Sequence, residues 1–320
     1  MQNDNITIFI ELPTWLGDAV MTTPAIENIL SYYRNSELII FGSFISTKLF
    51  VNHPRVKKII IDESKKSAFR YKNLYTYAKS IGKVDIAFSF RKNFTTKLLF
   101  FFIDSDFKYI YKRYDKIKTK HQVIRYNEFI DNSLGIKTTP SDLKIYLPKG
   151  NKKDIKSKPI LGINAGATYG SAKRWYVKEF ADVAISLSDK YDIIIFGGGA
   201  EVNICNDIEN EFKNSNITNY INLAGKTSVE ELILNISNLN LFITNDSGPM
   251  HIAAAFKIKT VSIFGPTRYK ETNQWNNPNE ILIRKDLDCS PCMKRVCPLK
   301  THECMKLITS KDVLEKLTNK

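Results

Sequence analysis

The feature that most constrains this chain is a regular alternation of short apolar runs with longer segments of helical periodicity. Residues 6–12 are typical of a buried strand, and residues 16–33 directly after them carry apolar side chains at helical spacing. Strands and helices that alternate in this way form parallel sheets joined by crossover helices. The sequence therefore predicts an α/β protein.

The alternation continues along the chain with one interruption. Further strands are expected at 37–42, 56–62, 85–90, 107–111, 160–164, 192–197, 219–223, 241–245 and 260–264. Helices are expected at 121–134, 175–188, 200–212, 228–237, 248–256 and 310–318, the last with Ser310 in position to cap it. The interruption, residues 148–159, is polar, basic and flanked by prolines, as linkers are. We expect two Rossmann-like domains, 1–150 and 151–320. The last helix could pack back on the N-terminal domain.

The charge of the chain is unevenly spread. Residues 1–150 hold 24 Lys and Arg against 14 Asp and Glu, whereas residues 151–320 hold 23 against 19. The first domain is therefore expected to meet the more anionic partner, which charge alone leaves open as a nucleic acid, an acidic membrane surface or a phosphorylated glycan. The alternative is that a composition rich in Lys, Asn and Ile reflects codon bias.

The apolar runs and the cysteines bear on the compartment. The N-terminus lacks the basic segment of a signal peptide, and the longest apolar runs, such as 98–103, are too short to cross a bilayer. We expect a cytoplasmic protein, soluble or peripheral to a membrane. Four of the five cysteines fall within sixteen residues, at Cys289, Cys292, Cys297 and Cys304. They suggest either a structural zinc or iron–sulfur site or free thiols that form disulfides only on oxidation.

Candidate functional residues gather where strands are expected to end, because ligands of parallel sheets bind at the carboxyl ends of the strands. The first expected strand is followed by Leu-Pro-Thr-Trp-Leu-Gly-Asp, which ends at Asp18. Gly17 allows a tight turn and the close approach of a substrate. Asp18 could act as a general base on a hydroxyl group, or could merely satisfy the first-turn amides of a helix.

Two loops of the second half have the character of a nucleotide site. After 160–164, the segment that ends in Lys173 could hold a diphosphate through its amides and its lysine, with Thr168 and Ser171 as hydrogen-bond partners. After 192–197, three glycines precede Glu201, which could accept hydrogen bonds from ribose or sugar hydroxyls. The alternative for the first segment is a solvated loop, and the alternative for the three glycines is a flexible turn.

A third such segment follows residues 241–245. Its sequence is Asp-Ser-Gly-Pro-Met-His, residues 246–251, and proline favours the first turn of a helix there. Free amides at the helix start suit an anion. Asp246 suits sugar hydroxyls, and His251 could lie by the phosphates or be a packed core residue.

Basic residues interleave with tyrosine and phenylalanine in the first half. They are Lys65, Lys66 and Arg70, then Arg91 and Lys92, then a stretch over 108–125. Such residues would hold an anionic glycan or a lipid headgroup, or would form a solvated face. No nucleic-acid-binding motif accompanies them, so nucleic acid is not an expected partner.

Taken together, these ordered motifs resemble the ADP-heptose:lipopolysaccharide heptosyltransferases, glycosyltransferase family nine. The Pro-x-Trp-x-Gly-Asp-x-Val-Met start, which includes Trp15, and the Cys-x2-Cys-x4-Cys cluster look like the heptosyltransferase II branch. The Asn-x-Gly-Ala-x-Tyr-Gly-x-Ala-Lys-Arg-Trp and Asn-Asp-Ser-Gly-Pro-Met-His segments are similar to the donor-binding motifs of the family. The resemblance covers nearly the whole chain. One departure is Tyr176, where the family often has proline.

The resemblance implies a GT-B fold, in which two Rossmann-like domains with parallel sheets face a central cleft. It implies inverting transfer of heptose from ADP-heptose onto a lipid A–Kdo–heptose acceptor at the cytoplasmic face of the inner membrane. No cofactor or metal is required, although a structural zinc remains an alternative at the cysteines. The rival functions are heptosyltransferase I acting on Kdo-lipid A, and a nucleotide-binding protein without transferase activity.

The resemblance also implies roles for individual residues. Asp18 matches the presumed base, and Lys173 and Thr168 match residues that meet the donor phosphates. Glu201 falls on the position associated with the adenosine ribose, and Asp246 on the one associated with the heptose hydroxyls. The backbone around Ser247, Gly248 and Met250 would line the diphosphate and adenine pocket.

Overall fold

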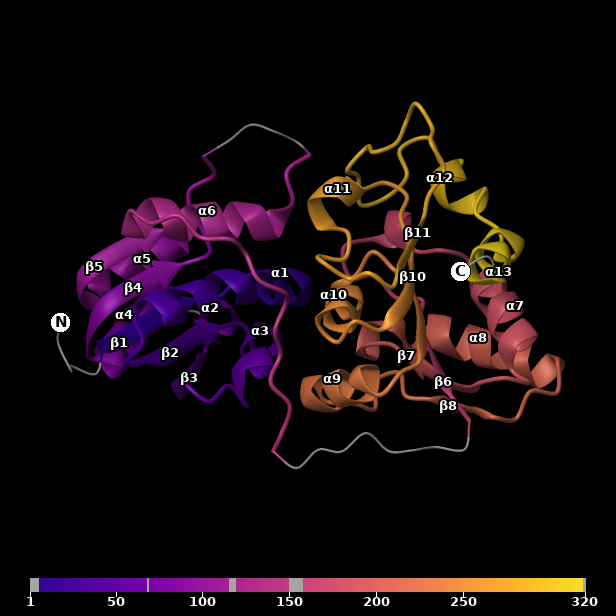
Figure 1. The fold of residues 1–320 in the computed structure, drawn as a ribbon, viewed down its shortest axis with the longest axis horizontal. Coiled ribbons are helices and arrows are strands. Elements are labelled where there is room, and N and C mark those ends of the chain that lie inside the picture. The colour runs from indigo at the N-terminus through magenta and orange to yellow at the C-terminus, as the bar shows by residue number, and fades with distance from the viewer. Residues whose placement is uncertain (1–5, 68, 115–118, 150–157, 319–320) are drawn as a thin grey trace. The chain divides into compact units, whose positions relative to one another are not determined.

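The computed structural model describes residues 6–67, 69–114, 119–149 and 158–318. The chain divides into two compact units, Met1–Lys149 and Gly150–Lys320. Each unit holds one parallel sheet with helices packed around it (Figure 1). Most of the predicted linker, residues 150–157, lies outside the described residues.

The sheet of the first unit has five parallel strands in the order β3-β2-β1-β4-β5. The strands are β1 Ile6–Glu11, β2 Ser36–Gly42, β3 Val56–Ile61, β4 Lys83–Ser89 and β5 Asp104–Ile110. The helices are α1 Leu16–Met21, α2 Thr23–Tyr32, α3 Phe44–Thr47, α4 Arg70–Ile81, α5 Phe94–Phe102 and α6 Gln122–Leu134. The predicted α/β alternation is confirmed.

The helices of this unit are anchored on the sheet through its buried core. Leu74 of α4 and Leu99 of α5 join Phe9 and Phe41 of the central strands in one buried cluster. Phe129 of α6 packs edge-on against Phe88 of β4, with the ring centroids 6.4 Å apart. Helix α6 also packs against α1 and α2. The start of α1, which carries Asp18, is therefore fixed by a helix that is itself anchored on the sheet.

The single helix predicted over 16–33 is two helices, α1 and α2. The break lies at Thr22, whose N–H contacts the carbonyls of Asp18 and Ala19 and whose hydroxyl donates to Ala19 at 2.7 Å. Pro24 follows at the start of α2, where its missing N–H costs no hydrogen bond. The apolar spacing is helical on both sides of Thr22, so periodicity alone did not reveal the break.

Glu27 of α2 ties three parts of the first unit together. Its carboxylate accepts hydrogen bonds from Lys144 at 3.1 Å and Tyr146 at 3.0 Å, and lies 3.4 Å from His53. Burial opposes ionisation, but the contacts with His53, Lys144 and Tyr146 prevail and lower the pKa of Glu27 to about 2. The segment after α6 is therefore held to the second helix by a charged network.

The sheet of the second unit has six parallel strands in the order β11-β10-β9-β6-β7-β8. The strands are β6 Ile160–Asn164, β7 Asp192–Phe196, β8 Tyr220–Asn222, β9 Leu241–Asn245, β10 Lys259–Ile263 and β11 Glu280–Ile283. The helices are α7 Val177–Leu187, α8 Val202–Asn214, α9 Val229–Ser237, α10 Gly248–Ala255, α11 Tyr269–Thr272, α12 Glu303–Lys306 and α13 Ser310–Thr318. Strand β11 was not predicted.

The last helix, α13, is capped by a residue other than the one predicted. Thr309, not Ser310, caps α13: its hydroxyl accepts from the N–H of Asp312 at 3.2 Å, and the Asp312 carboxylate accepts from the Thr309 N–H at 2.8 Å. The helix packs on α7 and β11, and its Val313 is buried in the core of the second unit. That it also packs back on the first unit stays a prediction. Among the described residues, no helix is long and apolar enough to cross a membrane.

Candidate functional site

The carboxyl ends of β6 and β9 are the centre of the candidate site in the second unit. These two strands are neighbours in the middle of the sheet, and all ten of their residues are buried. Each ends in an asparagine, Asn164 and Asn245, whose side chains bond to the loops rather than to solvent. The loops that follow are therefore anchored on the buried centre of the sheet.

Asn245 fixes both ends of the loop that follows β6. Its amide nitrogen donates to the carbonyl of Ala165 at 2.7 Å, and its amide oxygen accepts from the N–H of Trp175 at 3.0 Å. Asn164 donates to the hydroxyl of Ser247 at 3.2 Å. Two buried amide side chains thus set the conformation of the loop that carries Thr168, Ser171 and Lys173.

Lys173 and Asp246 are brought together by these loops. The Nζ of Lys173 lies 2.6 Å from Oδ2 of Asp246, and both side chains are largely buried. The hydroxyl of Thr267, in the loop after β10, donates to the same Asp246 oxygen at 2.6 Å. The ammonium also lies 4.8 Å from the centre of the Tyr169 ring. Two residues proposed for adjacent parts of one ligand are therefore in contact.

Glu201 lies against the same loop from the side of β7. It follows three glycines at the end of that strand, and its carboxylate accepts from the N–H of Gly198 at 2.9 Å. A Cβ atom placed on Gly166 would come within 2.1 Å of the Glu201 carboxyl group. Gly166 is therefore required, because a larger residue would collide with the Glu201 carboxyl group. Glu201 thus lies against the loop that carries Lys173. The helix expected over 200–212 begins with a 3-10 turn, Gly199–Glu201, before α8.

The start of α10 completes this edge of the sheet. Ser247 precedes the helix and Pro249 lies in its first turn, as predicted. Met250 and His251 are buried in the domain, with His251 only 3% exposed. Of the two interpretations of His251, the structure supports the packed residue. Thr168 and Ser171, in contrast, are exposed on their loop.

The cysteine-rich segment after β11 packs onto the Lys173 loop. The carbonyl of Arg295 accepts from the N–H of Ala172 at 3.0 Å, and the carbonyl of Met293 accepts from the Tyr169 hydroxyl at 2.8 Å. His302 donates from Nε2 to the carbonyl of Ala172 at 2.9 Å. The Arg295 guanidinium lies 5.5 Å from the centre of the Tyr169 ring. A second cation is thus held beside Lys173.

The four clustered cysteines are free thiols. Burial, with the neighbouring thiols Cys289, Cys292 and Cys297, raises the pKa of Cys304 to about 11. No three His, Cys, Asp or Glu side chains of the described residues are arranged to hold a metal ion. A structural zinc or iron–sulfur site at these cysteines stays an untested alternative, and the segment contacts the Lys173 loop through its backbone and His302.

The first unit contributes a second set of residues, at the carboxyl end of β1. Trp15 is half-exposed just before α1, and Gly17 and Asp18 lie in the first turn of that helix. The charge of Asp18 acts on Tyr126 of α6: burial raises the pKa of Tyr126 well above its usual value, and Asp18 adds to the effect. The carboxylate and the phenol are therefore neighbours at this end of the sheet.

The basic residues predicted to meet an acceptor lie in different environments. Lys65 and Lys92 are exposed, and Arg70 is half-buried with its Nη2 atom 3.4 Å from the Thr95 hydroxyl. Arg91 differs from the expectation, because its side chain is only 8% exposed and pairs with Glu11 at 3.1 Å and Asp62 at 3.7 Å. The side chain of Lys66 lies outside the described part.

Glu11 is the reason that Arg91 turns inward. It ends β1 inside the protein and accepts hydrogen bonds from Ser89 at 2.6 Å and Thr96 at 3.1 Å. Burial raises the pKa of Glu11 above its ordinary value, and Arg91 partly offsets this. Sequence reasoning missed Glu11, although a glutamate at the end of an otherwise apolar strand was a visible signal. It also missed Thr267, which follows β10 as the predicted residues follow their strands, and Arg295, which lies beyond a strand that was not predicted.

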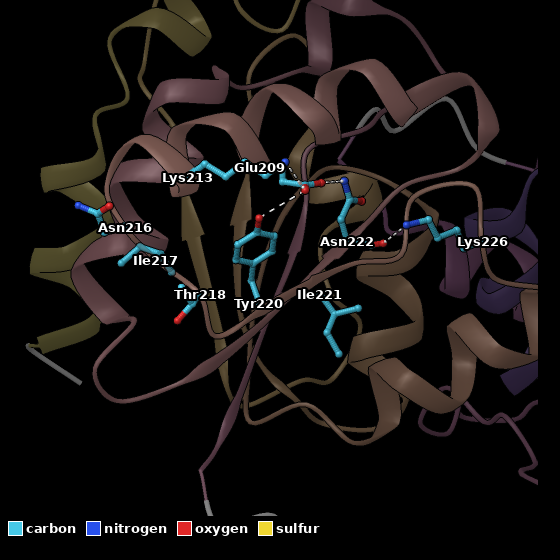
Figure 2. Close-up of a pocket in the computed structure, with 9 residues that line it drawn as sticks. All are labelled: Glu209, Lys213, Asn216, Ile217, Thr218, Tyr220, Ile221, Asn222 and Lys226. Atoms are coloured by element: carbon cyan, nitrogen blue, oxygen red, sulfur yellow. Dashed lines mark hydrogen bonds and ion pairs between the residues drawn. The ribbon is translucent and has the colours of Figure 1, made fainter.

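A separate hollow of about 620 Å³ lies along the outer edge of the second sheet. Figure 2 shows that Tyr220 and Asn222 of β8 both turn toward Glu209 of α8. Glu209 also pairs with Lys213 at 2.8 Å, so its charge is satisfied within the protein. The hollow shares no residue with the strand ends described above. The candidate functional site is therefore at the strand ends rather than in this hollow.

The chain is similar in sequence to known glycosyltransferases. A family model described as glycosyltransferase family 9 (heptosyltransferase) matches residues 106–302. The lipooligosaccharide heptosyltransferase 2 of Campylobacter jejuni serotype O:2 is 45% identical over 316 residues, covering 98% of this chain and 97% of that protein. The protein of the same name from Haemophilus influenzae is 25% identical, covering 82% of this chain and 84% of its own length.

Solved structures are similar in fold. The ADP-heptose LPS heptosyltransferase II of Escherichia coli superposes with a TM-score of 0.80 at 22% identity, covering 98% of each chain. A family 9 glycosyl transferase from Veillonella parvula superposes with a TM-score of 0.82, also at 22% identity, covering 100% of this chain and 98% of its own. Both sheets described above thus have counterparts in these enzymes, and the predicted GT-B fold class is confirmed.

Proposed function

This chain belongs to glycosyltransferase family 9, and from that premise we propose that it transfers L-glycero-D-manno-heptose from ADP-heptose onto the first inner-core heptose of a lipopolysaccharide or lipooligosaccharide acceptor. It is thus a heptosyltransferase II. The observation that carries this function is the identity of 45% with a lipooligosaccharide heptosyltransferase 2 over nearly the full length of both chains.

The donor is assigned to the second unit. Lys173 and Arg295 are two cations beside one loop, next to the amides at the start of α10, and this set suits a diphosphate. Glu201 would accept from the hydroxyls of the adenosine ribose. Asp246 would accept from the hydroxyls of the heptose, with Thr267 fixing the orientation of its carboxylate. The exposed hydroxyls of Thr168 and Ser171 are available to phosphate oxygens.

The acceptor is assigned to the first unit. Trp15 offers an exposed aromatic surface of the kind on which sugars pack, and Gly17 allows close approach. Lys65, Lys92 and Arg70 lie in loops or at a helix start beyond β3 and β4, on the same edge of the sheet as Asp18. Arg91 is not part of this assignment, because its charge is used by Glu11 and Asp62.

The reaction is a single displacement at the anomeric carbon. Asp18 takes the proton of the acceptor hydroxyl as the oxygen forms its bond to that carbon. The bond between the carbon and the phosphate oxygen breaks on the opposite face, which inverts the configuration and releases ADP. Lys173 and the loop amides stabilise the negative charge that develops on the departing diphosphate. The proposal uses these protein groups and no metal ion.

The acceptor of this reaction carries a lipid. We therefore place the protein at the cytoplasmic face of the inner membrane as a peripheral protein, which agrees with the excess of 24 basic over 14 acidic residues in residues 1–150. A phosphorylated glycan and an anionic membrane surface would both be attracted by this charge.

The donor assignment is tested by measuring ADP release with different sugar nucleotides. Purified protein would be given a heptosylated, delipidated acceptor together with ADP-heptose, ADP-glucose or UDP-glucose. Rapid release that requires both ADP-heptose and acceptor is the expected result. Equal release from all donors, or release that ignores the acceptor, would contradict the proposal.

A further inference from the structure

Helices α4 and α5 expose an unusual number of aromatic side chains. They lie side by side on one face of the first unit's sheet (Figure 1). Phe69, Tyr71 and Tyr75 at the start and middle of α4 are 71%, 58% and 46% exposed, and Phe94 and Phe101 of α5 are 67% and 77% exposed. Large apolar groups gathered on one surface usually mark a binding site for another molecule.

The outward stripe of α5 has a simple composition. Phe94, Lys97 and Phe101 are spaced so that they share one side of the helix, and all three are exposed. Leu99 and Phe100, on the opposite side, are buried in the core. The helix is therefore apolar on both sides, with a lysine between two phenylalanines on the side that faces solvent.

Helix α4 extends this surface. Tyr71 packs edge-on against Phe94 with the ring centroids 6.2 Å apart, and Tyr75 packs against Phe102 at 5.3 Å. The Nζ of Lys79 lies 5.6 Å from the centre of the Tyr75 ring. The exposed rings of the two helices thus form one continuous surface, defined here as the α4–α5 face.

The two helices of this face carry charge of one sign. Neither α4 nor α5 contains an acidic residue, and residues 64–102 hold nine Lys and Arg against a single acid, Asp85. The Asp85 carboxylate accepts the N–H of Thr7 at 2.7 Å within the sheet. Lys72, Lys79 and Lys97 are exposed among the rings. The two helices therefore offer both apolar rings and positive charge, and the nearest exposed acids in the sequence, Glu63 and Asp104, lie outside them.

We propose that the α4–α5 face binds an anionic lipid bilayer directly. Aromatic rings favour the boundary between headgroups and acyl chains, and lysines among them pair with lipid phosphates. The proposal rests on the proposed function in one respect, since a lipid-linked acceptor is reached only at a membrane. Arg70 begins α4 and Lys92 lies just before α5, so the face continues from loops assigned to the acceptor.

Sedimentation with vesicles tests this assignment. The full chain would be mixed with vesicles of equal parts phosphatidylglycerol and phosphatidylcholine, and separately with vesicles of phosphatidylcholine alone, with no donor or acceptor present. Wild type should bind the anionic vesicles much more tightly. Lys72→Ala/Lys79→Ala/Lys97→Ala should weaken this binding roughly a hundredfold, because each lysine near the surface contributes about fivefold. Phe94→Ser/Phe101→Ser should weaken it about tenfold or more.

A matched control removes exposed apolar groups elsewhere. Val296 and Leu299 of the second unit are 68% and 58% exposed, so Val296→Ser/Leu299→Ser deletes similar surface and should leave vesicle binding unchanged. Thermal unfolding, and turnover with a delipidated acceptor, should be the same for all variants. Since the vesicles carry no acceptor, failure of the proposed function would leave their binding intact, and failure of binding would leave that turnover intact.

Two kinds of result would overturn the proposal. One concerns the vesicles: either the lysine and phenylalanine variants bind them as wild type does, or wild type shows no preference for anionic vesicles. The other is a wild-type dimer in sedimentation velocity that Phe94→Ser/Phe101→Ser converts to a monomer, without any vesicle binding by the wild type. That outcome would make the α4–α5 face an interface between copies of the chain.

Discussion

Lys173 and Asp246 form an ion pair of 2.6 Å that joins the loop after β6 to the loop after β9. The pair unites the group proposed for the donor diphosphate with the group proposed for the transferred sugar. Each holds the other in place, and Thr267 holds Asp246 from a third loop. The geometry of the donor site is therefore set largely by contacts within the protein.

Replacing Lys173 tests the charge proposed to stabilise the leaving group. Lys173→Ala should lower kcat about a hundred- to a thousandfold, because the diphosphate gains negative charge mainly in the transition state. Steady-state ADP release would measure this. Lys178→Ala is the control, since Lys178 is exposed and pairs with Asp182 on its own helix. A Lys173→Ala rate within a few-fold of wild type would remove this residue from the diphosphate.

Replacing Asp18 tests the proposed base. Asp18→Asn keeps the shape of the side chain but cannot take a proton, so transfer should fall about a hundred- to ten-thousandfold. The affinity for ADP-heptose, measured by calorimetry, should stay unchanged, because the donor is assigned to the other unit. Asp104→Asn, at an exposed acid of β5, is the control. Near-normal transfer by Asp18→Asn would show that another group accepts the proton.

Gly166 tests the contact between the Lys173 loop and Glu201. Gly166→Ala would place a Cβ within 2.1 Å of the Glu201 carboxyl group. Overpacking of this kind costs about 1–3 kcal/mol of folding stability, and a displacement of Glu201 that costs donor binding the same amount would weaken it roughly five- to a hundredfold. Gly199→Ala is matched to it, because a Cβ there meets nothing within 4 Å. Equal donor affinity for the two variants would argue against a role for Glu201.

Glu27 predicts how the stability of the first unit responds to acid. Its pKa is lowered to about 2, so its contribution is present above the ordinary value of 4.5 and is lost as the pH falls toward 2. Glu27→Gln should cost up to about 3 kcal/mol at neutral pH. It should also flatten the loss of stability in acid, as measured by urea unfolding at a series of pH values. Glu37→Gln, beside exposed Lys57, should cost less than about 1 kcal/mol; an equal cost would contradict the account.

The parts of the fold that were predictable are those in which the local pattern and the tertiary environment agree. Strands β6 and β9 were predicted with their observed bounds because each is an apolar run between polar loops, and the sheet buries both of its faces. Strand β11 was missed because its pairing with β10, rather than its own sequence, is what makes it a strand. Local sequence does not contain that pairing.

The site was predictable for a different reason, and only in part. Residues that follow strands share one edge of a parallel sheet, so Lys173, Glu201 and Asp246 could be grouped from their positions alone. Arg91 shows the limit, because its burial depends on Glu11, which is eighty residues away in the sequence. Which basic side chain faces solvent and which neutralises a buried acid is decided by such distant pairs.

The most direct test of the central claim is the mass of the product formed from ADP-heptose with two truncated acceptors. One acceptor would end in Kdo, and the other would carry one heptose on that Kdo. The account predicts that only the heptosylated acceptor gains the mass of one further heptose. A gain on the Kdo-terminated acceptor alone would make the protein a heptosyltransferase I, and no gain on either would contradict heptose transfer altogether.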